Sequence, residues 1–219
     1  MSKYKVLGLF KGTKKVLSSG LESAIRKRSV ETLEIKKQEL PGDDVVDQKH
    51  HGGDMRVIHH YSAVNYNHLK KSFPDIADKF QGGTFGENLF TEELTEVDLC
   101  IGDIFMVGSA KLQLTVPRRP CSTIDQGYED NRILKEVISS GHVGWFYTVL
   151  EEGSVSVGDY LEHTERPFPN LRISDLYDQG YKAPRFSNIP FLQECFDTSL
   201  MDKGWMPKLV KALSLTGQD

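Results

Sequence analysis

A short segment from Asp47 to Arg56, DQKHHGGDMR, contains residue types suited to holding an anion. Its adjacent glycines, Gly52 and Gly53, let the backbone come close to a ligand or adopt a positive φ. The side chains around them offer hydrogen-bond donors and positive charge for a phosphate: Lys49, His50, His51 and Arg56. A surface turn with solvated polar side chains is the alternative interpretation, and spacing by itself leaves both open.

A second segment, VPRRPCSTI, places Cys121 in a stiff and positively charged surrounding. Arg118 and Arg119 lie within three residues of the thiol. Neighbouring positive charge favours the thiolate, which is the nucleophile and the metal ligand. A lone cysteine is often a small buried hydrophobic residue, but Pro-Arg-Arg-Pro is a poor core sequence. That structural interpretation does fit Cys100 and Cys195, which lie among apolar residues.

A third segment, GGTFGENL, has three glycines in five residues and two polar residues beside them. Glu87 and Asn88 are suited to hydrogen-bonding a heterocycle, because an amide both donates and accepts. A hairpin loop in which Asn88 satisfies its own turn is the alternative. His59 and His60 lie in a predicted strand, so they face opposite sides and are not expected to bind one metal together.

The elements that must position these segments are mainly strands in the first three quarters of the chain. Alternation and β-branched residues predict strands near 3–10, 29–40, 56–61, 104–107, 111–116, 144–150, 155–157 and 160–161. Helices are expected from the Ser62 cap to about Ser72, on to Phe80, and from an Asn131 cap to Ser139. The pattern of apolar residues changes near Arg166-Pro167. Apolar spacing then predicts helices from a Ser174 cap to Gly180, and over 190–200 and 206–215.

Composition narrows the class of protein further. The 219 residues carry a net charge of −4, which argues against a nucleic-acid binder. No apolar run approaches the roughly 18 residues of a membrane-spanning helix, and the N-terminus reads as a strand. The three cysteines are widely spaced and odd in number, which argues against a disulfide framework. This favours a reducing, cytoplasmic location. Phosphate-loop, HExxH and GxSxG motifs are not found, which excludes several common enzyme classes.

The order of these motifs resembles the MOSC domain. KHHGG is followed by FGEN, a Gly-Asp turn before a strand, PRxPC, GW and Val-x-x-Gly-Asp. This domain is shared by the C-termini of molybdenum-cofactor sulfurases and by the mitochondrial amidoxime-reducing component. The compact length and helical tail are similar to the stand-alone bacterial YiiM-like subfamily. The resemblance covers residues 1–165 as the MOSC domain and residues 166–219 as a C-terminal three-helix unit.

The resemblance implies a mainly β fold, a strongly bent barrel-like sheet with a few helices and a small C-terminal helical unit. It implies that Cys121 coordinates the molybdenum of the molybdenum cofactor, whose pterin dithiolene supplies two further sulfurs. The other positions that match the family's cofactor site are Lys49, His50, His51, Gly52, Gly53, Arg56, Asn88 and Arg118. Cofactor-binding members reduce N-hydroxylated compounds, such as hydroxylamino-purines and amidoximes, to amines.

The leading hypothesis is therefore a molybdenum-dependent reductase of N-hydroxylated substrates. No flavin or iron–sulfur signature is visible, so a flavin or iron–sulfur reductase is expected as the electron donor. His51 and Asp125 are candidate proton donors near the metal. Two alternatives stay open: a non-catalytic carrier of the molybdenum cofactor or of activated sulfur, and a zinc or thiol enzyme built on Cys121 with His50 or His51. Cysteine desulfuration is not expected, because the chain lacks the pyridoxal-phosphate domain of the sulfurases.

Overall fold

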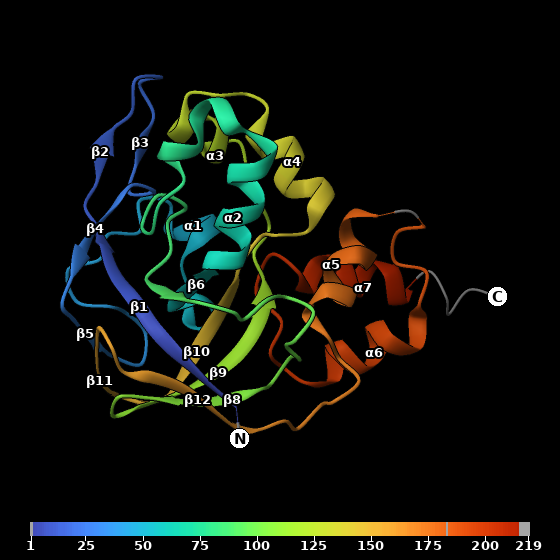
Figure 1. Cartoon of the computed structure of the whole chain (residues 1–219). Helices are drawn as coiled ribbons and strands as arrows, with labels where there is room; N and C mark the ends of the chain where they lie inside the picture. The colour runs from blue at the N-terminus through green and yellow to red at the C-terminus, as the bar shows by residue number, and fades with distance from the viewer. Residues whose placement is uncertain (1, 183, 215–219) are drawn as a thin grey trace.

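The centre of the molecule is a β-sheet that closes on itself. The computed structural model describes residues 2–182 and 184–214. Seven strands follow one another around the ring: β1 (Lys3–Gly12), β12 (Tyr160–Glu165), β8 (Ile104–Val107), β9 (Ala110–Pro117), β10 (Trp145–Glu151), β6 (Ile58–Ser62) and β7 (Leu89–Thr91), which returns to β1. This ring confirms the predicted fold class, a mainly β, barrel-like domain with helices (Figure 1).

The ring closes because the long strand β1 has several partners. Its start pairs antiparallel with β12, with Lys3 opposite Glu162. Further along, a register shift between Val6 and Gly8 lets it pair with β7. Its last residues pair with β4 (Lys27–Val30). Two smaller ribbons complete the strands: β2 (Lys15–Val16) with β3 (Glu22–Ser23), and β5 (Thr32–Ile35) with β11 (Gly153–Ser156).

The barrel interior is filled by the alternating side chains that the sequence predicted. Leu112, Leu114 and Val116 of β9 are all fully buried, as period two requires. Pro117 ends this strand, as expected, because it has no N–H to donate to a neighbour. The predicted strand at 29–40 is instead two short strands, β4 and β5, which lie in different sheets.

Three helices gather at one end of the barrel (Figure 1). They are α2 (Ala63–Ser72), followed by the 3-10 segment η2 (Pro74–Lys79), then α3 (Thr123–Tyr128) and α4 (Ile133–Ser140). Ser62 caps α2 as predicted, accepting from the Asn65 N–H at 3.4 Å. One expectation was wrong, because the N-cap of α4 is Arg132 and not Asn131. Helix α3, which contains a glycine and has little apolar periodicity, was not predicted.

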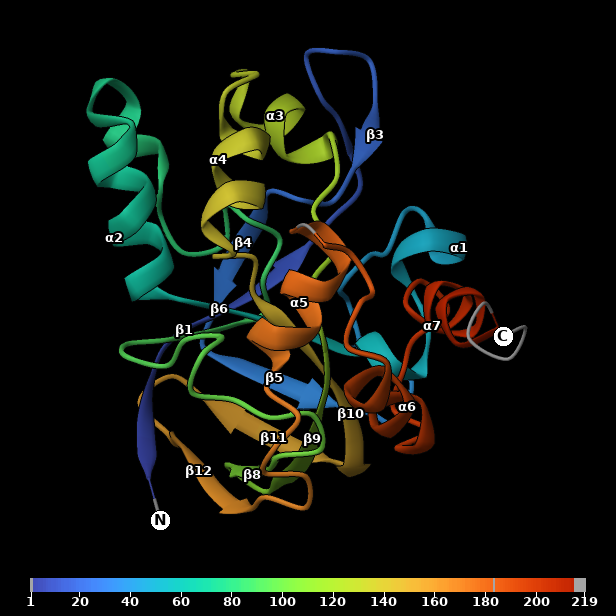
Figure 2. The same ribbon diagram turned by 90° about the vertical axis from the view of Figure 1, so that its right-hand side faces the viewer.

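The C-terminal helices pack on the side of the barrel (Figure 2). They are α5 (Ile173–Tyr181), α6 (Ile189–Asp197) and α7 (Met206–Ser214). The predicted Ser174 cap was wrong, because α5 begins after Arg172. Trp205 is fully buried and donates its Nε1–H to the Pro117 carbonyl at 3.1 Å. These helices share one apolar core with the barrel, and the division at residues 165 and 166 stays a prediction.

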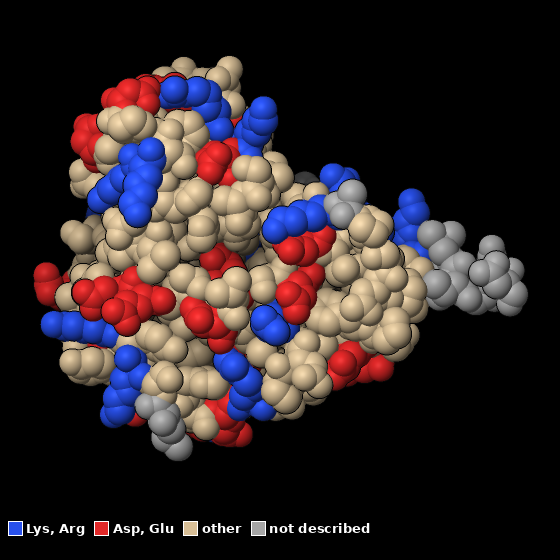
Figure 3. Space-filling model, turned by 45° about the vertical axis from the view of Figure 1, so that its right-hand side comes forward, with Lys and Arg blue, Asp and Glu red and all other residues tan. Residues whose placement is uncertain are grey.

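Three further observations concern the chain as a whole. All three cysteines carry free thiols. Among the described helices, none combines the length and the apolar character needed to span a bilayer. Basic and acidic side chains are interspersed on the face shown in Figure 3, so that face presents no extended patch of one sign.

Candidate functional site

A cavity of about 210 Å³ opens beside the barrel where the three predicted segments meet. Its wall includes residues from all three: His51 and Arg56, then Gly86 and Asn88, then Arg118 and Cys121. Most of the remaining wall comes from the β3 region, Lys27, the loop after β5, and two residues of the barrel, His59 and Phe146. The sequence segments therefore form a single site.

Cys121 lies half-buried in the wall of this cavity, in the loop between β9 and α3. Burial would raise the pKa of its thiol, but a hydrogen bond with His51, the charge of Arg118 and hydrogen bonds with Thr123 outweigh it. Together they lower the pKa from 9.0 to about 6. A thiol with this pKa is mostly thiolate at neutral pH. The predicted cationic, thiolate-favouring surrounding is therefore present.

This thiol should be alkylated at a rate that follows its own ionisation. We expect the iodoacetamide reaction of the metal-free protein to be half-maximal near pH 6, and to be flat from neutral pH upward. The other two cysteines are buried and their pKa values are raised, Cys195 to about 12, so they should stay unmodified. Peptide mass spectrometry across a pH series measures this. A Cys121 rate still rising at about pH 8, as for an ordinary thiol, would contradict the assignment.

Arg118 is held in place by the protein around it. Its backbone N–H donates to the Gly144 carbonyl at 2.8 Å, and its Nη1 donates to the Phe85 carbonyl at 2.6 Å. Its guanidinium also lies over the Phe85 ring, 4.9 Å from the centroid. These contacts fix a positive charge at the cavity wall, close enough to Cys121 to influence its ionisation.

The double-glycine segment shapes a tight turn. The short helix α1 (Gln48–His51) leads into Gly52 and Gly53, and the 3-10 turn η1 (Asp54–Arg56) follows. A side chain at Gly52 would overlap Gln48, and Gly53 has φ of 117°, which favours glycine. Of the described residues predicted here, His51 lines the cavity, whereas Lys49 is exposed and neither it nor the glycines line it. The side chain of His50 lies outside the described residues.

Arg56 lines the cavity but is already engaged by an acid from the C-terminal helices. Its guanidinium forms an ion pair with Asp202, and both side chains are buried, with 4% and 3% exposed. It also lies over Phe146, 5.4 Å from the ring centroid. Its charge is thus largely balanced within the protein. The predicted contact between Arg56 and a phosphate of the cofactor stays a prediction.

Asn88 also lines the cavity, and its amide is used by the protein. Its Oδ1 accepts from the His59 backbone N–H at 3.1 Å, and its Nδ2 donates to the Phe10 carbonyl and to Asp43, at 3.2 and 2.8 Å. The role of this amide is therefore to order the wall. Asp43 in turn accepts from the Lys27 ammonium at 2.7 Å, in an ion pair with 5% and 8% of the two side chains exposed.

The Lys27–Asp43 pair and His59 are cavity residues that the sequence did not reveal. Lys27 precedes its partner by 16 residues, and no motif links them. His59 and His60 do face opposite sides, as predicted: His59 lines the cavity, and His60 bonds inside the barrel to Tyr147 and Thr91. Burial lowers the pKa of His59 well below its usual value, so the ring is neutral at pH 7.

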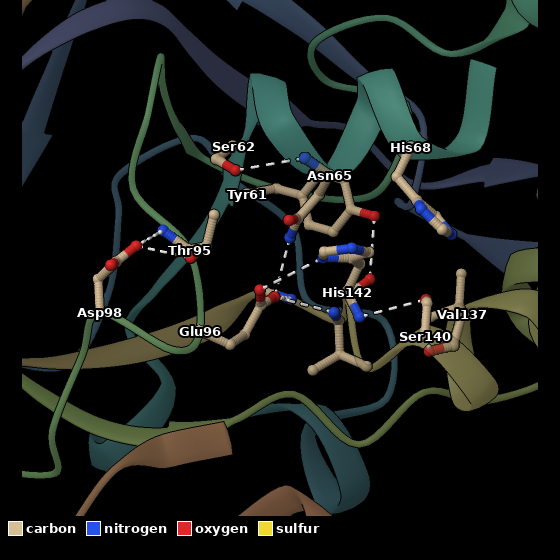
Figure 4. A network of polar contacts seen from close by, with 12 residues as sticks. Tyr61, Ser62, Asn65, His68, Thr95, Glu96, Asp98, Val137, Ser140 and His142 are labelled. Carbon is tan, nitrogen blue, oxygen red and sulfur yellow. Dashed lines mark hydrogen bonds and ion pairs between the residues drawn. The ribbon is translucent and has the colours of Figure 1, made fainter. Parts of the chain in front are cut away.

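Behind the cavity wall, Glu96 fixes the segment that supports Arg118 (Figure 4). This buried carboxylate accepts from the Asn65 side chain at 2.8 Å and from the backbone N–H groups of Val143 and Gly144 at 2.9 and 2.7 Å. Gly144 then accepts from the Arg118 N–H. The carboxylate thus joins α2 to the start of β10, through backbone groups that carry no sequence signal.

Within the part of the chain that the structure describes, no group of three or more His, Cys, Asp or Glu side chains is arranged to hold an ion. The zinc alternative thus finds no complete set of protein ligands within that part. Cys121 remains as a single soft donor at the cavity wall.

The closed barrel, with a cysteine of lowered pKa in the loop after β9, matches a known domain. The MOSC domain family profile matches residues 47–162, and the chain belongs to that family. Within it, the chain is 35% identical to Protein YiiM of Escherichia coli (strain K12) over 208 residues, covering 93% of this chain and 90% of that one. The chain is thus YiiM-like.

Two further comparisons agree with this placement. The crystal structure of YiiM from Escherichia coli superposes with a TM-score of 0.80, at 26% identity, covering 100% of this chain and 95% of that one. A protein of Gibberella moniliformis (strain M3125 / FGSC 7600) named "Reductase" is 31% identical over 153 residues. That match covers 69% of this chain but only 27% of the fungal protein.

Proposed function

We propose that this protein binds the molybdenum cofactor with Cys121 as the protein ligand to the metal, and reduces N-hydroxylated compounds to amines. The observation that supports it most directly is a half-buried thiol of low pKa in the wall of a cavity of about 210 Å³. A thiolate is a soft ligand and suits a sulfur-rich metal. The donor chemistry of the site therefore fits this group.

The residues that would hold the cofactor are those that meet at the cavity. Cys121 would bind the metal, with His51 and Arg118 at the same end, and the polar groups of Lys27, Asp43 and Asn88 would face the organic part. The bound cofactor would supply a metal that changes its oxidation state by two units. The protein supplies position, charge and protons.

The balance of the reaction defines what the chain must provide. Converting R–NH–OH to R–NH2 and water consumes two electrons and two protons. The electrons would come from a separate reductase with a flavin or iron–sulfur centre. Of the two candidate proton donors, the geometry favours His51, which lines the cavity and bonds to Cys121. Asp125 is not among the described lining residues, and its carboxylate accepts from the Leu134 N–H at 2.7 Å.

The name of one relative supports the class of reaction. The fungal relative is called a reductase, although this chain spans about a quarter of it. Protein YiiM matches this chain over nearly its whole length. Neither name specifies a substrate, so the N-hydroxylated class is proposed from the family resemblance and the cysteine-centred site.

The test is to purify the chain from a host that makes the cofactor, and to measure metal, pterin and turnover on the same sample. We expect molybdenum and pterin in equal amounts, and reduction of an N-hydroxylated purine or an amidoxime by viologen as a chemical electron donor. Bound cofactor without any substrate consumption would instead support the carrier alternative. Zinc without molybdenum or pterin would overturn the proposal.

A further inference from the structure

Three cations gather where the Cys121 loop meets the C-terminal helices: Arg119, Arg185 and Lys208. We name them the cation cluster. Lys208 lies over the ring of Tyr181, the last residue of α5, and Arg119 and Arg185 are close enough to oppose the rise that burial causes in the pKa of that phenol, while the nearby acid Asp202 is occupied by Arg56. Within residues 2–182 and 184–214, no carboxylate lies at ion-pair distance from any of the three.

Arg119 is fixed against the start of α7 by close packing. Gly204 lets the guanidinium lie flat on the backbone, because a Cβ at that position would overlap it. The Nε of Arg119 is shielded from solvent and has no hydrogen-bond partner in the structure. A buried donor without a partner costs free energy, so this placement favours an arginine whose acceptor arrives with a ligand.

Lys208 completes the cluster from α7. Its ammonium lies 5.4 Å from the centroid of the Tyr181 ring and 5.7 Å from that of Trp205, and the side chain is half-buried. The pKa of Lys208 is lowered, by burial first and then by the charges of Arg119 and Arg185. Arg119 and Arg185 therefore disfavour the charge on Lys208, and an anion would relieve that repulsion.

We propose that the cation cluster binds a phosphate group of the substrate, so that the reacting compound is a phosphate-bearing N-hydroxylated base. The reaction in this proposal rests on the proposed function, whereas the phosphate-binding site rests on the cation cluster. A phosphate carries nearly two negative charges and three acceptor oxygens. An arginine guanidinium can donate two parallel hydrogen bonds to such a group, and a lysine ammonium adds a compact positive charge. Arg119 is two residues from Cys121, so such a group would lie near the reacting end.

The position of the cation cluster indicates that the anion it binds belongs to the substrate and not to the cofactor. Its residues are not among those that line the cavity assigned to the cofactor. Arg119 is two residues from Cys121 and Arg118 is three, yet Arg118 lies on the cavity and Arg119 on the C-terminal helices. One arginine therefore lies toward the cavity and the other toward the C-terminal helices, on either side of the loop that carries Cys121.

Two measurements test the proposal, one of which needs no turnover. Adenosine 5′-monophosphate should bind the purified protein at least about tenfold more tightly than adenosine in low salt, by isothermal titration calorimetry. Lys208→Met and Arg185→Ala should each lower the ratio of the affinity for the nucleotide to that for the nucleoside by about tenfold. Arg185 is exposed, so its variant tests the cluster even if Lys208→Met were unstable. With the loaded protein, the ratio of kcat/KM for N6-hydroxyadenosine monophosphate over N6-hydroxyadenosine should fall by the same factor in both variants.

The matched control is Lys70→Met, which removes one exposed lysine from α2 and should leave both preferences unchanged. Equal binding of nucleotide and nucleoside by the wild type would overturn the proposal. Loss of bound pterin in the cluster variants, with no loss of nucleotide preference, would assign the anion to the cofactor and also overturn it. If neither hydroxylated compound is reduced but the nucleotide preference depends on the cluster, the anion site stands and the proposed reaction fails.

Discussion

Replacing Cys121 with serine is expected to reduce molybdenum retention by more than about 100-fold, and reductase turnover with it. A serine hydroxyl stays protonated at neutral pH and is a hard donor, so it does not replace a soft thiolate. The fold should persist, because the residue is half-buried in a loop and the change in the free energy of unfolding should stay below about 1 kcal/mol. Metal analysis, pterin extraction and thermal denaturation on the same preparations measure this.

The matched control is Cys100→Ser. That thiol is buried beside Pro169, away from the cavity, so the variant should keep its molybdenum even if it loses some stability. Molybdenum and pterin retained by Cys121→Ser at the wild-type level would refute the assignment of the metal ligand.

Replacing Arg56 with alanine should lower the free energy of unfolding by about 3–5 kcal/mol. The change leaves the Asp202 carboxylate in a place where 3% of its side chain is exposed, without the cation that balances it. Arg56 is the last residue of η1 and Asp202 precedes α7, so the same change should also loosen the C-terminal helices from the cavity. Urea denaturation followed by tryptophan fluorescence reports this, since Trp205 is buried and donates its backbone N–H to the Asp202 carboxylate at 2.7 Å.

This second expectation changes how a cofactor-binding assay should be interpreted. The sequence suggested that Arg56→Ala would weaken cofactor binding through a lost phosphate contact. The ion pair implies that any such loss arises together with lost stability. The control is Lys3→Met, which breaks a pair with 55% and 37% of its side chains exposed and should cost less than about 1 kcal/mol. A similar small cost for Arg56→Ala would show that the buried pair contributes little.

The parts of the site that were predictable lie in contiguous motifs. Cys121 and Arg118 are three residues apart in a loop that two prolines stiffen, so their chemistry could be inferred without a fold. Strand β9 was predictable because one buried face gives strict alternation. Helix α2 was predictable from its serine cap. In each case the determining interactions lie within a few residues of one another.

The rest depends on contacts between distant segments. Asp202 is 146 residues from Arg56, and Glu96 reaches Gly144 across 48. No local pattern indicates such pairs, because the sequence around each acid is that of an ordinary polar loop. The same holds for α3, whose six residues include a glycine and which is stabilised by packing of Ile124 and Tyr128 rather than by helix propensity. Tertiary contacts decided these features.

The pairing of β1 with β12 has a consequence for the protein while it is being made. Lys3 meets Glu162, so the ring stays open until most of the polypeptide has left the ribosome. During that interval the start of the first strand, Lys3 to Lys5, presents unpaired backbone groups, which other nascent chains can use as a template for aggregation. Closure across so long a stretch is also entropically slow. Yield in the cell should therefore depend on how quickly translation delivers the last strand, and on chaperones that shield the first.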